Sequence, residues 1–409
     1  MLRGARRLAS TALGGRARRL CTWPGSPDAV TSVLPPMDAE KDGLSRPVVE
    51  KGPLGTRFNN PWSTWREWGI RDAAIIAATL REFVKEGGSG GWLLEEKKPT
   101  AADFRQTFPL TPVDWSTVTA CPKDAVQALW VGHATALVQI GDVRFITDPV
   151  FSDRCSPTQW MGPKRVVPPA VDLDDPQFPK LDFVVISHNH YDHLDRNSVA
   201  GLHRKFGDDL AWYVPMGLAS WFRSRGVSNV TELTWWEGLP HGDSGVSLRF
   251  LPTQHWSARS LTDRRSTLWG SWLVTGPAGR VYFGGDTAYC PAFKQIGQEH
   301  APIDLALIPV GAYLPREFMR PQHVDPEEAV KIHQDIGARF SMGIHCCTFA
   351  LTTEALDQPP RDLEAAVSAA GLSPDAFVVL RHGEHIRVAG GRVTNTPKLL
   401  PVSEQAEDG

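Results

Sequence analysis

Residues 183–195 read FVVISHNHYDHLD. The stretch opens with four apolar residues, which predict a short buried strand, and three histidines and one aspartate follow within the next seven positions. Imidazole nitrogen and carboxylate oxygen are ligands that zinc prefers in proteins. In an extended segment residues two apart point to the same side, so His188 and His190 can bind one ion. Asp192 and His193 follow a bend and can bind a second ion. We therefore predict a metal site where this strand ends, because a surface histidine cluster would leave the buried strand unexplained.

The same pattern of an apolar run followed by a polar turn recurs from about residue 125 onward. Five of these runs lead into a histidine or an aspartate: 128–131 before His133, 143–146 before Asp148, 248–251 before His255, 281–283 before Asp286, and 340–344 before His345. Helical periodicity separates some of the runs, as in 325–336 and 361–370. Ligands at strand ends hold a geometry better than ligands on loose loops. The pattern predicts an α/β fold of sheets covered by helices, with the site at strand ends.

The composition narrows the function classes. The chain has 409 residues, of which 42% are hydrophobic and 22% charged, and its net charge is -3. A mildly acidic protein is a poor match for a nucleic-acid binder, so we expect no nucleic-acid partner. Its longest apolar runs are shorter than the ~20 residues of a membrane-spanning helix, so we expect membrane contact to be peripheral. The six cysteines form no CxxC pair, which indicates a reducing, intracellular setting.

The N-terminal region divides into three segments. Residues 1–20 contain six arginines and no acidic residue, which is typical of a mitochondrial transit peptide; a basic tail that contacts anionic lipid is the alternative. Residues 21–58 are rich in Pro, Gly and Ser, as linkers are. Residues 62–84 place three tryptophans before apolar residues at helical spacing, which indicates a helix packed on the core or a membrane contact.

Several motifs together carry a family resemblance. The H-N-H-Y-D-H motif, the Gly285-Asp286 pair and the isolated His255 and His345 resemble the metallo-β-lactamase superfamily. Within it, phrases between about residues 55 and 384 resemble the N-acyl-phosphatidylethanolamine-hydrolysing phospholipase D family: NPW (60–62), WVGHAT (130–135), MGPKR (161–165), SHNHYDHLD (187–195), LWGSW (268–272), YCPAF (289–293), QHVDPEEAV (322–330) and RHGE (381–384). None of these phrases is specific alone, but the set is.

The resemblance implies a metallo-β-lactamase-like four-layer αβ/βα sandwich with a dinuclear metal site at one edge. It implies a cofactor of two Zn²⁺ per chain and a set of seven ligands. One zinc ion is assigned to His188, His190 and His255, the second to Asp192, His193 and His345, and Asp286 bridges both. We expect domains at 1–54 (a targeting or disordered segment and linker), 55–124 (an extension that packs on the core), 125–390 (catalytic) and 391–409 (a flexible tail).

The implied reaction is hydrolysis of N-acyl-phosphatidylethanolamine to an N-acylethanolamine and phosphatidic acid. Two divalent cations that share a water lower its pKa towards ~7, so a metal-bridging hydroxide is available to attack phosphorus. Asp192 and Asp286 are expected to be catalytic through the metals. The resemblance places His323 beside the substrate phosphate, where it stabilises charge or protonates the leaving group; a helix-start histidine is the alternative.

Other side chains receive smaller roles. Tyr191 is expected to flank the lipid head group, and Gln159 and Trp160 to line the same mouth, with plain loop packing as their alternative. Asp148 is expected to orient a metal-bound histidine, or else to be a turn residue before Pro149. We interpret His133 as a structural histidine rather than a ligand.

Three departures from the family pattern bear on the site and on destination. Cys346 and Cys347 stand where the family has an aromatic residue and a glycine, so we expect buried or pocket-lining thiols that are able to disturb coordination or to oxidise. Ser257 and Ala258 lack the basic residue that the family can carry there. The Arg-rich N-terminus differs from the polar tail of the family. Two subcellular locations therefore stay open: mitochondria, which the arginines favour, and the Golgi, early endosome or nuclear envelope, which the resemblance implies.

Partners and competing functions complete the expectations. The resemblance implies a membrane phospholipid substrate and a homodimer with a shared lipid-facing cavity. The alternatives are another hydrolase on this fold, such as a lactonase or an RNA phosphodiesterase, and a catalytically inactive scaffold. An inactive scaffold would have lost ligands, whereas all seven positions are filled here.

Overall fold

The computed structural model of the chain describes residues 44–52, 55–67 and 107–400, all of which belong to one compact unit. The predictions for residues 1–20 and for the helical face at residues 75–84 fall outside these ranges. Among the described residues no helix is both long and apolar enough to cross a bilayer.

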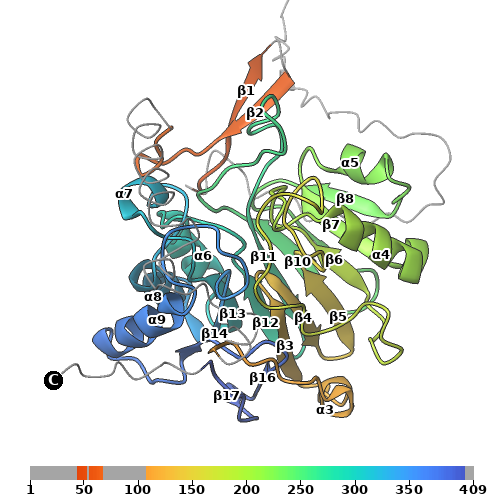
Figure 1. Cartoon of the computed structure of the whole chain (residues 1–409), viewed down its shortest axis with the longest axis vertical. Helices are drawn as coiled ribbons and strands as arrows, with labels where there is room; N and C mark the ends of the chain where they lie inside the picture. Colours follow the sequence, from red (N-terminus) through yellow and green to blue (C-terminus); the bar gives the residue numbers. More distant parts are fainter. Residues whose placement is uncertain (1–43, 53–54, 68–106, 401–409) are drawn as a thin grey trace, which may run out of the picture. The chain divides into compact units, whose positions relative to one another are not determined.

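The first large sheet has eight strands in the order β17-β16-β3-β4-β5-β6-β7-β8 (Figure 1). Its strands are β3 (Ala125–Gly132), β4 (Thr135–Ile140), β5 (Val143–Thr147), β6 (Phe183–Val185), β7 (Ala211–Pro215), β8 (Val230–Leu233), β16 (His385–Ala389) and β17 (Arg392–Val393). Strands β5 to β8 run parallel to one another, whereas β17, β16, β3, β4 and β5 pair antiparallel.

Both faces of this sheet are buried, and alternate residues of a strand pack against opposite faces. In β3, Val126, Ala128 and Trp130 join the core between the two sheets, whereas Leu129 and Val131 join a second core. The second core also contains buried residues of α3 (Trp115–Thr119), α4 (Arg196–Phe206) and α5 (Ala219–Arg223). Because neighbouring side chains of a strand point to opposite faces, a nearly continuous apolar strand lies between a sheet and a helical layer.

The second large sheet has seven strands in the order β15-β14-β13-β12-β11-β10-β9. Its strands are β9 (Gly238–Pro240), β10 (Ser247–Leu251), β11 (Ser271–Gly276), β12 (Gly279–Phe283), β13 (Ile303–Pro309), β14 (Ala338–Ile344) and β15 (Phe377–Val378). Helices α6 (Ala292–His300), α8 (Pro326–Asp335) and α9 (Gln358–Ala369) bury their apolar residues against it. The Asp325 side chain caps α8 by accepting a hydrogen bond from the Glu328 amide. Pro326 lies in the first turn of the helix, where a backbone N–H would have no intrahelical acceptor.

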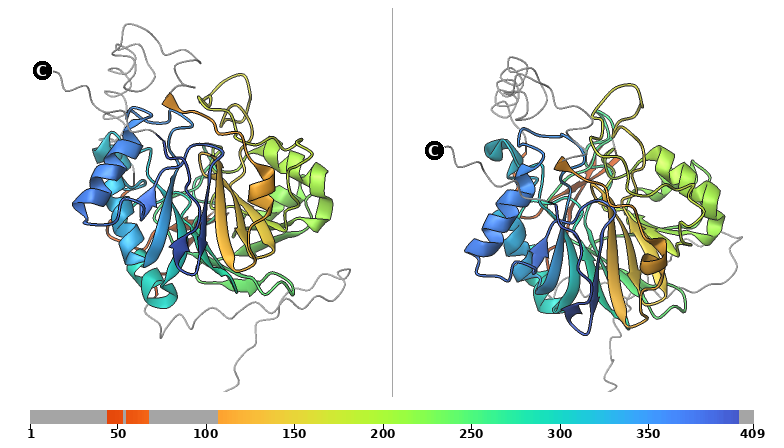
Figure 2. Two further views of the ribbon diagram at one scale, coloured as in Figure 1. Left: turned by 90° about the horizontal axis from the view of Figure 1, so that it is seen from below. Right: turned by 60° about the horizontal axis from the view of Figure 1, so that its bottom comes forward.

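The layers follow the order helix, sheet, sheet, helix (Figure 2). Helices α4 and α5 cover the outer face of the eight-stranded sheet, and α6, α8 and α9 lie on the opposite side of the molecule. The predicted four-layer αβ/βα sandwich is confirmed. The helices predicted at 325–336 and 361–370 correspond to α8 and α9.

The site-bearing turns lie at equivalent ends of their strands. Strands β12, β13 and β14 are parallel, and β10 has the same direction as β12 because both pair antiparallel with β11. The turns after β10, β12 and β14 therefore emerge at one edge. Gly285, with φ of 59°, follows β12, and a Cβ there would lie 2.5 Å from Cβ of Ser187. Glycine at this position thus allows the turn after β12 to lie directly against the turn after β6.

Two predicted boundaries differ from the structure. Residues 48–52, which we expected in a disordered segment, form β1 (Val48–Gly52), which pairs with β2 (Gly55–Asn59). The expected flexible tail begins within the fold, because β17 pairs with β16 and Leu400 is buried. The composition of these two segments did not reveal the strand pairings, because the pairings depend on hydrogen bonds between backbone groups. Residues of the extension after β2 contact the core, where Trp62 stacks on Trp235 at a centroid distance of 5.5 Å.

Candidate metal centre

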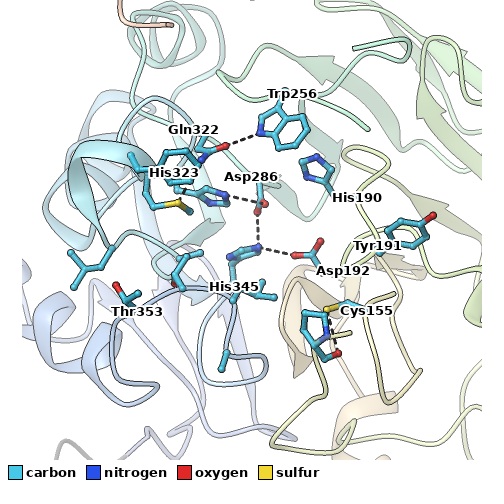
Figure 3. A pocket seen from close by; sticks show the side chains of 18 of the residues that line it. Cys155, His190, Tyr191, Asp192, Trp256, Asp286, Gln322, His323, His345 and Thr353 are labelled. Atoms are coloured by element: carbon cyan, nitrogen blue, oxygen red, sulfur yellow. Dashed lines mark hydrogen bonds and ion pairs between the residues drawn. The ribbon is translucent and has the colours of Figure 1, made fainter. Parts of the chain in front are cut away.

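The carboxylate of Asp286 is the point on which buried histidines converge (Figure 3). Its Oδ2 lies 3.2 Å from Nε2 of His193, 3.7 Å from Nε2 of His255 and 3.8 Å from Nε2 of His188. Its Oδ1 lies 3.1 Å from Nε2 of His345. These residues follow four different strands, so the fold brings together side chains that lie up to 157 positions apart in sequence (188 to 345).

One group of donor atoms lies on the His188 side of Asp286. Nδ1 of His190 lies 2.9 Å from Nε2 of His188 and 3.3 Å from Nε2 of His255. These three nitrogens and an oxygen of Asp286 all lie within 4.8 Å of one another. Three imidazole nitrogens and one carboxylate oxygen form a donor set suited to a single transition-metal ion.

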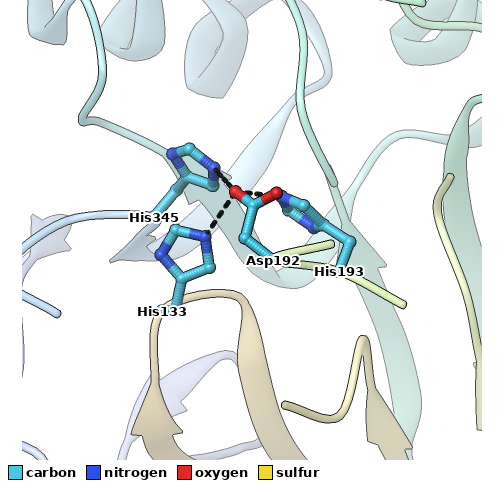
Figure 4. A group of neighbouring side chains, drawn as sticks. All are labelled: His133, Asp192, His193 and His345. Atoms are coloured by element: carbon cyan, nitrogen blue, oxygen red, sulfur yellow. Dashed lines mark hydrogen bonds and ion pairs between the residues drawn. The ribbon is translucent and has the colours of Figure 1, made fainter. Parts of the chain in front are cut away.

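A second group lies on the His345 side (Figure 4). Oδ2 of Asp192 lies 3.4 Å from Nε2 of His345 and 3.5 Å from Nε2 of His193. His133 completes this group, since its Nε2 lies 3.0 Å from the same oxygen. The structure thus brings all seven sequence-predicted ligands together in two neighbouring groups that share Asp286.

The donor atoms fit metal ions. Two ligands about 2.1 Å from one tetrahedral zinc ion lie about 3.4 Å apart, close to the spacings between Asp286 and the histidines. Nε2 of His193, Nε2 of His345 and Oδ1 of Asp286 are buried and have no hydrogen bond of acceptable geometry. Buried polar atoms that lack a partner are rare and costly. A cation bound between them would satisfy all three.

The charges in the cluster are strongly coupled. Burial alone would raise the pKa of the Asp286 carboxyl, but His193 and His345 hold that pKa well below its usual range. The pKa of Asp192 is lowered in the same way by His193 and His133. Burial lowers the pKa of His190 to about 3 and that of His255 to about 4. Although burial acts to lower them, Asp286 and Asp192 raise the pKa of His193 well above its usual value and that of His345 to about 9. A metal ion bound between these rings and the ionised carboxylates would displace the two protons, because imidazole binds metal in its neutral form.

Hydrogen bonds outside the cluster fix which nitrogen of each ring faces inward. Nδ1 of His193 donates to Oδ2 of Asp148 over 2.7 Å, and Nδ1 of His255 donates to the carbonyl of Gln322 over 2.8 Å. Ser187 gives its hydroxyl hydrogen to Asp148, so it accepts from Nδ1 of His188. In each case Nε2 keeps its lone pair for the site. Asp148 therefore has the orienting contact that we expected of it.

His133 lies closer to the chemistry than the sequence suggested. The ring is buried, bonds to Asp192, and stands 4.1 Å from the His345 ring between centroids. We interpreted it as structural because a lone histidine after a strand gives no sign of its neighbours. The structure instead places it in direct contact with a predicted ligand. Its backbone has a φ of 54°, and residues held in this region cluster at functional sites.

A cavity of about 490 Å³ opens onto the cluster. Its polar floor consists of His190, Asp192, Asp286, His323 and His345. The remaining wall is mainly apolar and includes Trp256, Ala312, Leu314, Pro315, Phe318, Met319 and Leu351. Sequence reasoning missed this wall, because the apolar residues after β13 and in α7 (Arg316–Met319) look like ordinary core positions.

The predicted substrate contacts divide into two pairs. Tyr191 and His323 line the cavity, and Nε2 of His323 lies 4.0 Å from Oδ2 of Asp286. Gln159 instead hydrogen-bonds to the Arg154 backbone, and Trp160 is 75% exposed. Neither Gln159 nor Trp160 is among the residues that line this cavity. Their predicted role as substrate contacts stays a prediction.

The two adjacent cysteines are buried, as expected. The Cys347 thiol donates to the carbonyl of Leu356 over 3.3 Å. Burial raises the pKa of Cys347 well above its usual value. Within the described part of the chain, neither thiol belongs to a group of side chains that could hold a metal ion. The structure therefore gives no support to coordination by these thiols.

Glu354 is a further residue that the sequence did not single out. The buried carboxylate accepts from the amides of Ala312, Tyr313 and Leu314 over 2.6, 3.3 and 3.0 Å. It thereby fixes the turn that carries the apolar cavity wall. Nothing in the local sequence distinguishes it from an exposed glutamate.

Comparisons with known proteins show which proteins this chain resembles. Residues 143–346 match the beta-lactamase superfamily domain. The chain is 42% identical over 347 residues to N-acyl-phosphatidylethanolamine-hydrolyzing phospholipase D 1 of Caenorhabditis elegans, covering 81% of this chain and 92% of the relative. It is 36% identical over 259 residues to a Saccharomyces cerevisiae protein named N-acyl-phosphatidylethanolamine-hydrolyzing phospholipase D, mitochondrial, covering 62% of this chain and 54% of the relative.

Among solved structures, the isothiocyanate hydrolase from Delia radicum gut bacteria superposes with a TM-score of 0.51 at 17% identity. The match covers 64% of this chain and 99% of the other. At that identity the likeness extends to the fold alone.

Proposed function

This chain belongs to the N-acyl-phosphatidylethanolamine-hydrolysing phospholipase D family of metal-dependent hydrolases, and we propose that it is itself a phospholipase of this specificity. Its substrate would be N-acyl-phosphatidylethanolamine, and its products an N-acylethanolamine and phosphatidic acid. The observation that carries the proposal is the meeting of a metal-ligand cluster and an apolar wall in one cavity of about 490 Å³. A lipid phosphodiester needs both, because its reacting phosphate is charged and its chains are apolar.

Two metal ions would be held by the two groups around Asp286. His188, His190 and His255 would hold one ion, Asp192, His193 and His345 the other, and Asp286 would contact both, and we propose zinc because of the nitrogen-rich donor set. When bound, the ions would supply a hydroxide at neutral pH and neutralise charge at phosphorus.

The chain's own residues would position the phosphate. The P–O bond to the ethanolamine oxygen breaks, a water oxygen bonds to phosphorus, and the departing oxygen takes a proton. His323 lines the cavity with its Nε2 4.0 Å from Oδ2 of Asp286, and Arg316 Nη1 holds the His323 backbone by donating to its carbonyl over 2.8 Å. Its Nε2–H can donate to a phosphoryl oxygen or to the leaving oxygen. Tyr191 is held in the wall by its hydroxyl, which donates to the Arg259 carbonyl over 3.0 Å.

A substrate panel in ¹⁸O-labelled water tests the proposal. Vesicles of N-acyl-phosphatidylethanolamine, an acyl lactone and a tRNA precursor are each offered to the zinc-loaded protein. We expect turnover of the lipid, with ¹⁸O in phosphatidic acid and none in the N-acylethanolamine. Turnover of the lactone or the RNA without the lipid would overturn the proposal, as would label in the alcohol product.

The subcellular location of the protein is a separate proposal. The Arg-rich composition of residues 1–20 and the name of the yeast relative both favour mitochondria. Fusion of residues 1–35 to a fluorescent protein should produce mitochondrial fluorescence, whereas a diffuse or Golgi signal would contradict it. Homodimer formation stays a prediction, which the molar mass in solution would test.

A further inference from the structure

We propose that an exposed face beside the cavity docks on the surface of an anionic phospholipid bilayer. This docking face consists of Trp160, Met161 and Leu261 together with Arg196, Arg225 and Arg259. The inference deepens the proposed function, on which it rests, by naming the physical partner that presents the substrate. It requires no step of the reaction, so it is tested separately from hydrolysis.

The apolar part of the docking face lies on two neighbouring loops. Trp160 and Met161 are 75% and 59% exposed, and Leu261 is fully exposed. Gln159, next to Trp160, and Arg259 and Asp263, on either side of Leu261, line one shared depression of about 400 Å³. Large apolar side chains exposed together in this way mark interaction sites.

The first of these loops is internally braced. The Arg154 amide donates to Oε1 of Gln159 over 3.1 Å, and Nε2 of Gln159 donates back to the Arg154 carbonyl over 3.0 Å. The Arg154 side chain also bonds to the carbonyl of Gly162. A braced loop loses little freedom when its tip enters a partner, so less of the binding free energy is lost to ordering.

The charged part of the docking face surrounds the same depression. Arg196, Arg225 and Arg259 line it, with Arg225 3.8 Å above the Trp221 ring and Arg259 4.0 Å above the Tyr191 ring. Among the described residues, no carboxylate oxygen lies within the 4.0 Å ion-pair distance of these three guanidinium groups. Arg259 donates to the carbonyls of Asn189 and Leu194, and Arg225 donates to the carbonyl of Trp221, but neutral carbonyls do not cancel their charge. The positive charge of the three groups can therefore attract phosphate groups.

The acidic residues nearby are already engaged with backbone amides. Asp195 accepts from the amides of Asn197 and Ser198 at the start of α4, and Asp263 accepts from the amides of Arg259 and Ser260. Their lone pairs hold the local backbone. Both carboxylates keep their charge, but the three arginines outnumber them, so the charged side chains that line the depression sum to a positive charge. This charge complements the negative surface of a bilayer that contains anionic lipid.

The position of the face relative to the cavity explains why a bilayer fits better than a soluble anion. Tyr191 lines both the catalytic cavity and the depression, so the two openings share one wall. Tryptophan favours the head-group level of a membrane, and arginine there contacts lipid phosphates. Docking at this face would bring the cavity mouth to the layer from which a diacyl substrate must enter.

Co-sedimentation with vesicles tests the proposal without turnover. The zinc-loaded full chain is mixed with phosphatidylcholine vesicles that either contain or lack phosphatidylserine, which is neither substrate nor product. We expect binding to the anionic vesicles that weakens at least several-fold at high salt. Leu261→Asp and the double variant Arg196→Gln/Arg225→Gln should each lower the bound fraction several-fold. Soluble glycerophosphoserine at equal concentration should not compete, because it offers no apolar layer.

Matched controls make the test specific to this face. Arg204→Gln removes an exposed arginine from the same helix as Arg196, and Val49→Asp places a charge at an exposed apolar position on β1. Both controls should bind as the parent does. Equal binding by the parent, Leu261→Asp and the arginine double variant would overturn the proposal, as would equal loss in the controls. Hydrolysis of a detergent-dispersed substrate by Leu261→Asp distinguishes lost docking from a wrong proposed function.

Discussion

Nε2 of His133 lies 3.0 Å from Oδ2 of Asp192, and this contact joins the first turn of the eight-stranded sheet to the metal-binding loop. The His133 amide donates to Thr348 Oγ1 over 2.8 Å, and the His345 amide donates to the His133 carbonyl over 3.1 Å. The histidine therefore connects Asp192 with the segment that carries His345. It orients the carboxylate that the second metal ion would need.

Replacing His133 should weaken the metal site on the Asp192 side. Loss of an orienting hydrogen bond to a ligand typically lowers metal affinity about 10- to 100-fold. If the chain binds the two zinc ions that we propose, His133→Ala should lose one of them first in a chelator competition monitored by metal analysis. His203→Ala, which removes a histidine of α4, is the control. Parental affinity for both ions in His133→Ala would show that the contact does not matter.

Asp148→Asn should impair the same site through His193. The carboxylate accepts from His193 Nδ1 and from the Ser187 amide and hydroxyl, and it is completely buried. An amide keeps only one acceptor oxygen, so one of these donors loses its partner. Zinc affinity should fall about 10- to 100-fold, measured by the same competition. An unchanged affinity would mean that His193 needs no orienting partner.

Glu354→Ala should loosen the turn that carries the cavity wall. The variant leaves three backbone amides without their acceptor, and hydrogen bonds to charged groups are worth about 1.5–3 kcal/mol each. We expect a loss of about 2–4 kcal/mol in unfolding free energy, measured by urea denaturation. Glu364→Ala on the exposed side of α9 should change it by less than about 0.5 kcal/mol. Equal effects of the two variants would refute the anchoring role.

His333 should contribute to acid unfolding. Burial lowers its pKa from 6.5 to about 4, and its Nδ1 lies 2.7 Å from Oγ of Ser341. Between these two pH values the unfolded chain binds the proton and the folded chain does not, so stability is full above pH 6.5 and falls as the pH drops towards 4.

Thermal unfolding of the parent and of His333→Gln between pH 7 and 4 measures this term. The parent should lose more stability on acidification than the variant, by on the order of 3 kcal/mol if its whole shift is expressed. Parallel curves would show that His333 does not set the acid limit.

The sequence was most informative where the chemistry is local. The HNHYDH motif is contiguous, so its metal-binding character was visible from residue types and spacing. The partners His255, Asp286 and His345 lie on other strands, and only the family resemblance joined them to the motif. Short continuous apolar runs predicted the buried strands, because a strand that is covered on both faces is apolar at nearly every position.

What the sequence missed depends on non-local contacts. The side chain of His133 reaches Asp192 across 59 positions, and Glu354 reaches the turn at residues 312–314 across about 40. Nothing near Glu354 in sequence is distinctive, and the strand-end position of His133 does not identify Asp192 as its partner. Similarly, the pairing of β17 with β16 depends on backbone hydrogen bonds, which composition does not record.

The most direct test of the account is a titration of zinc into metal-free protein, with the rate of N-acyl-phosphatidylethanolamine hydrolysis measured against bound zinc. We predict that the metal-free chain is inactive and that the rate reaches its maximum when two ions are bound per chain. In Asp286→Ala, which removes the carboxylate shared by both groups, added zinc should not restore the rate. Full hydrolysis by the metal-free protein, or by Asp286→Ala, would contradict the account.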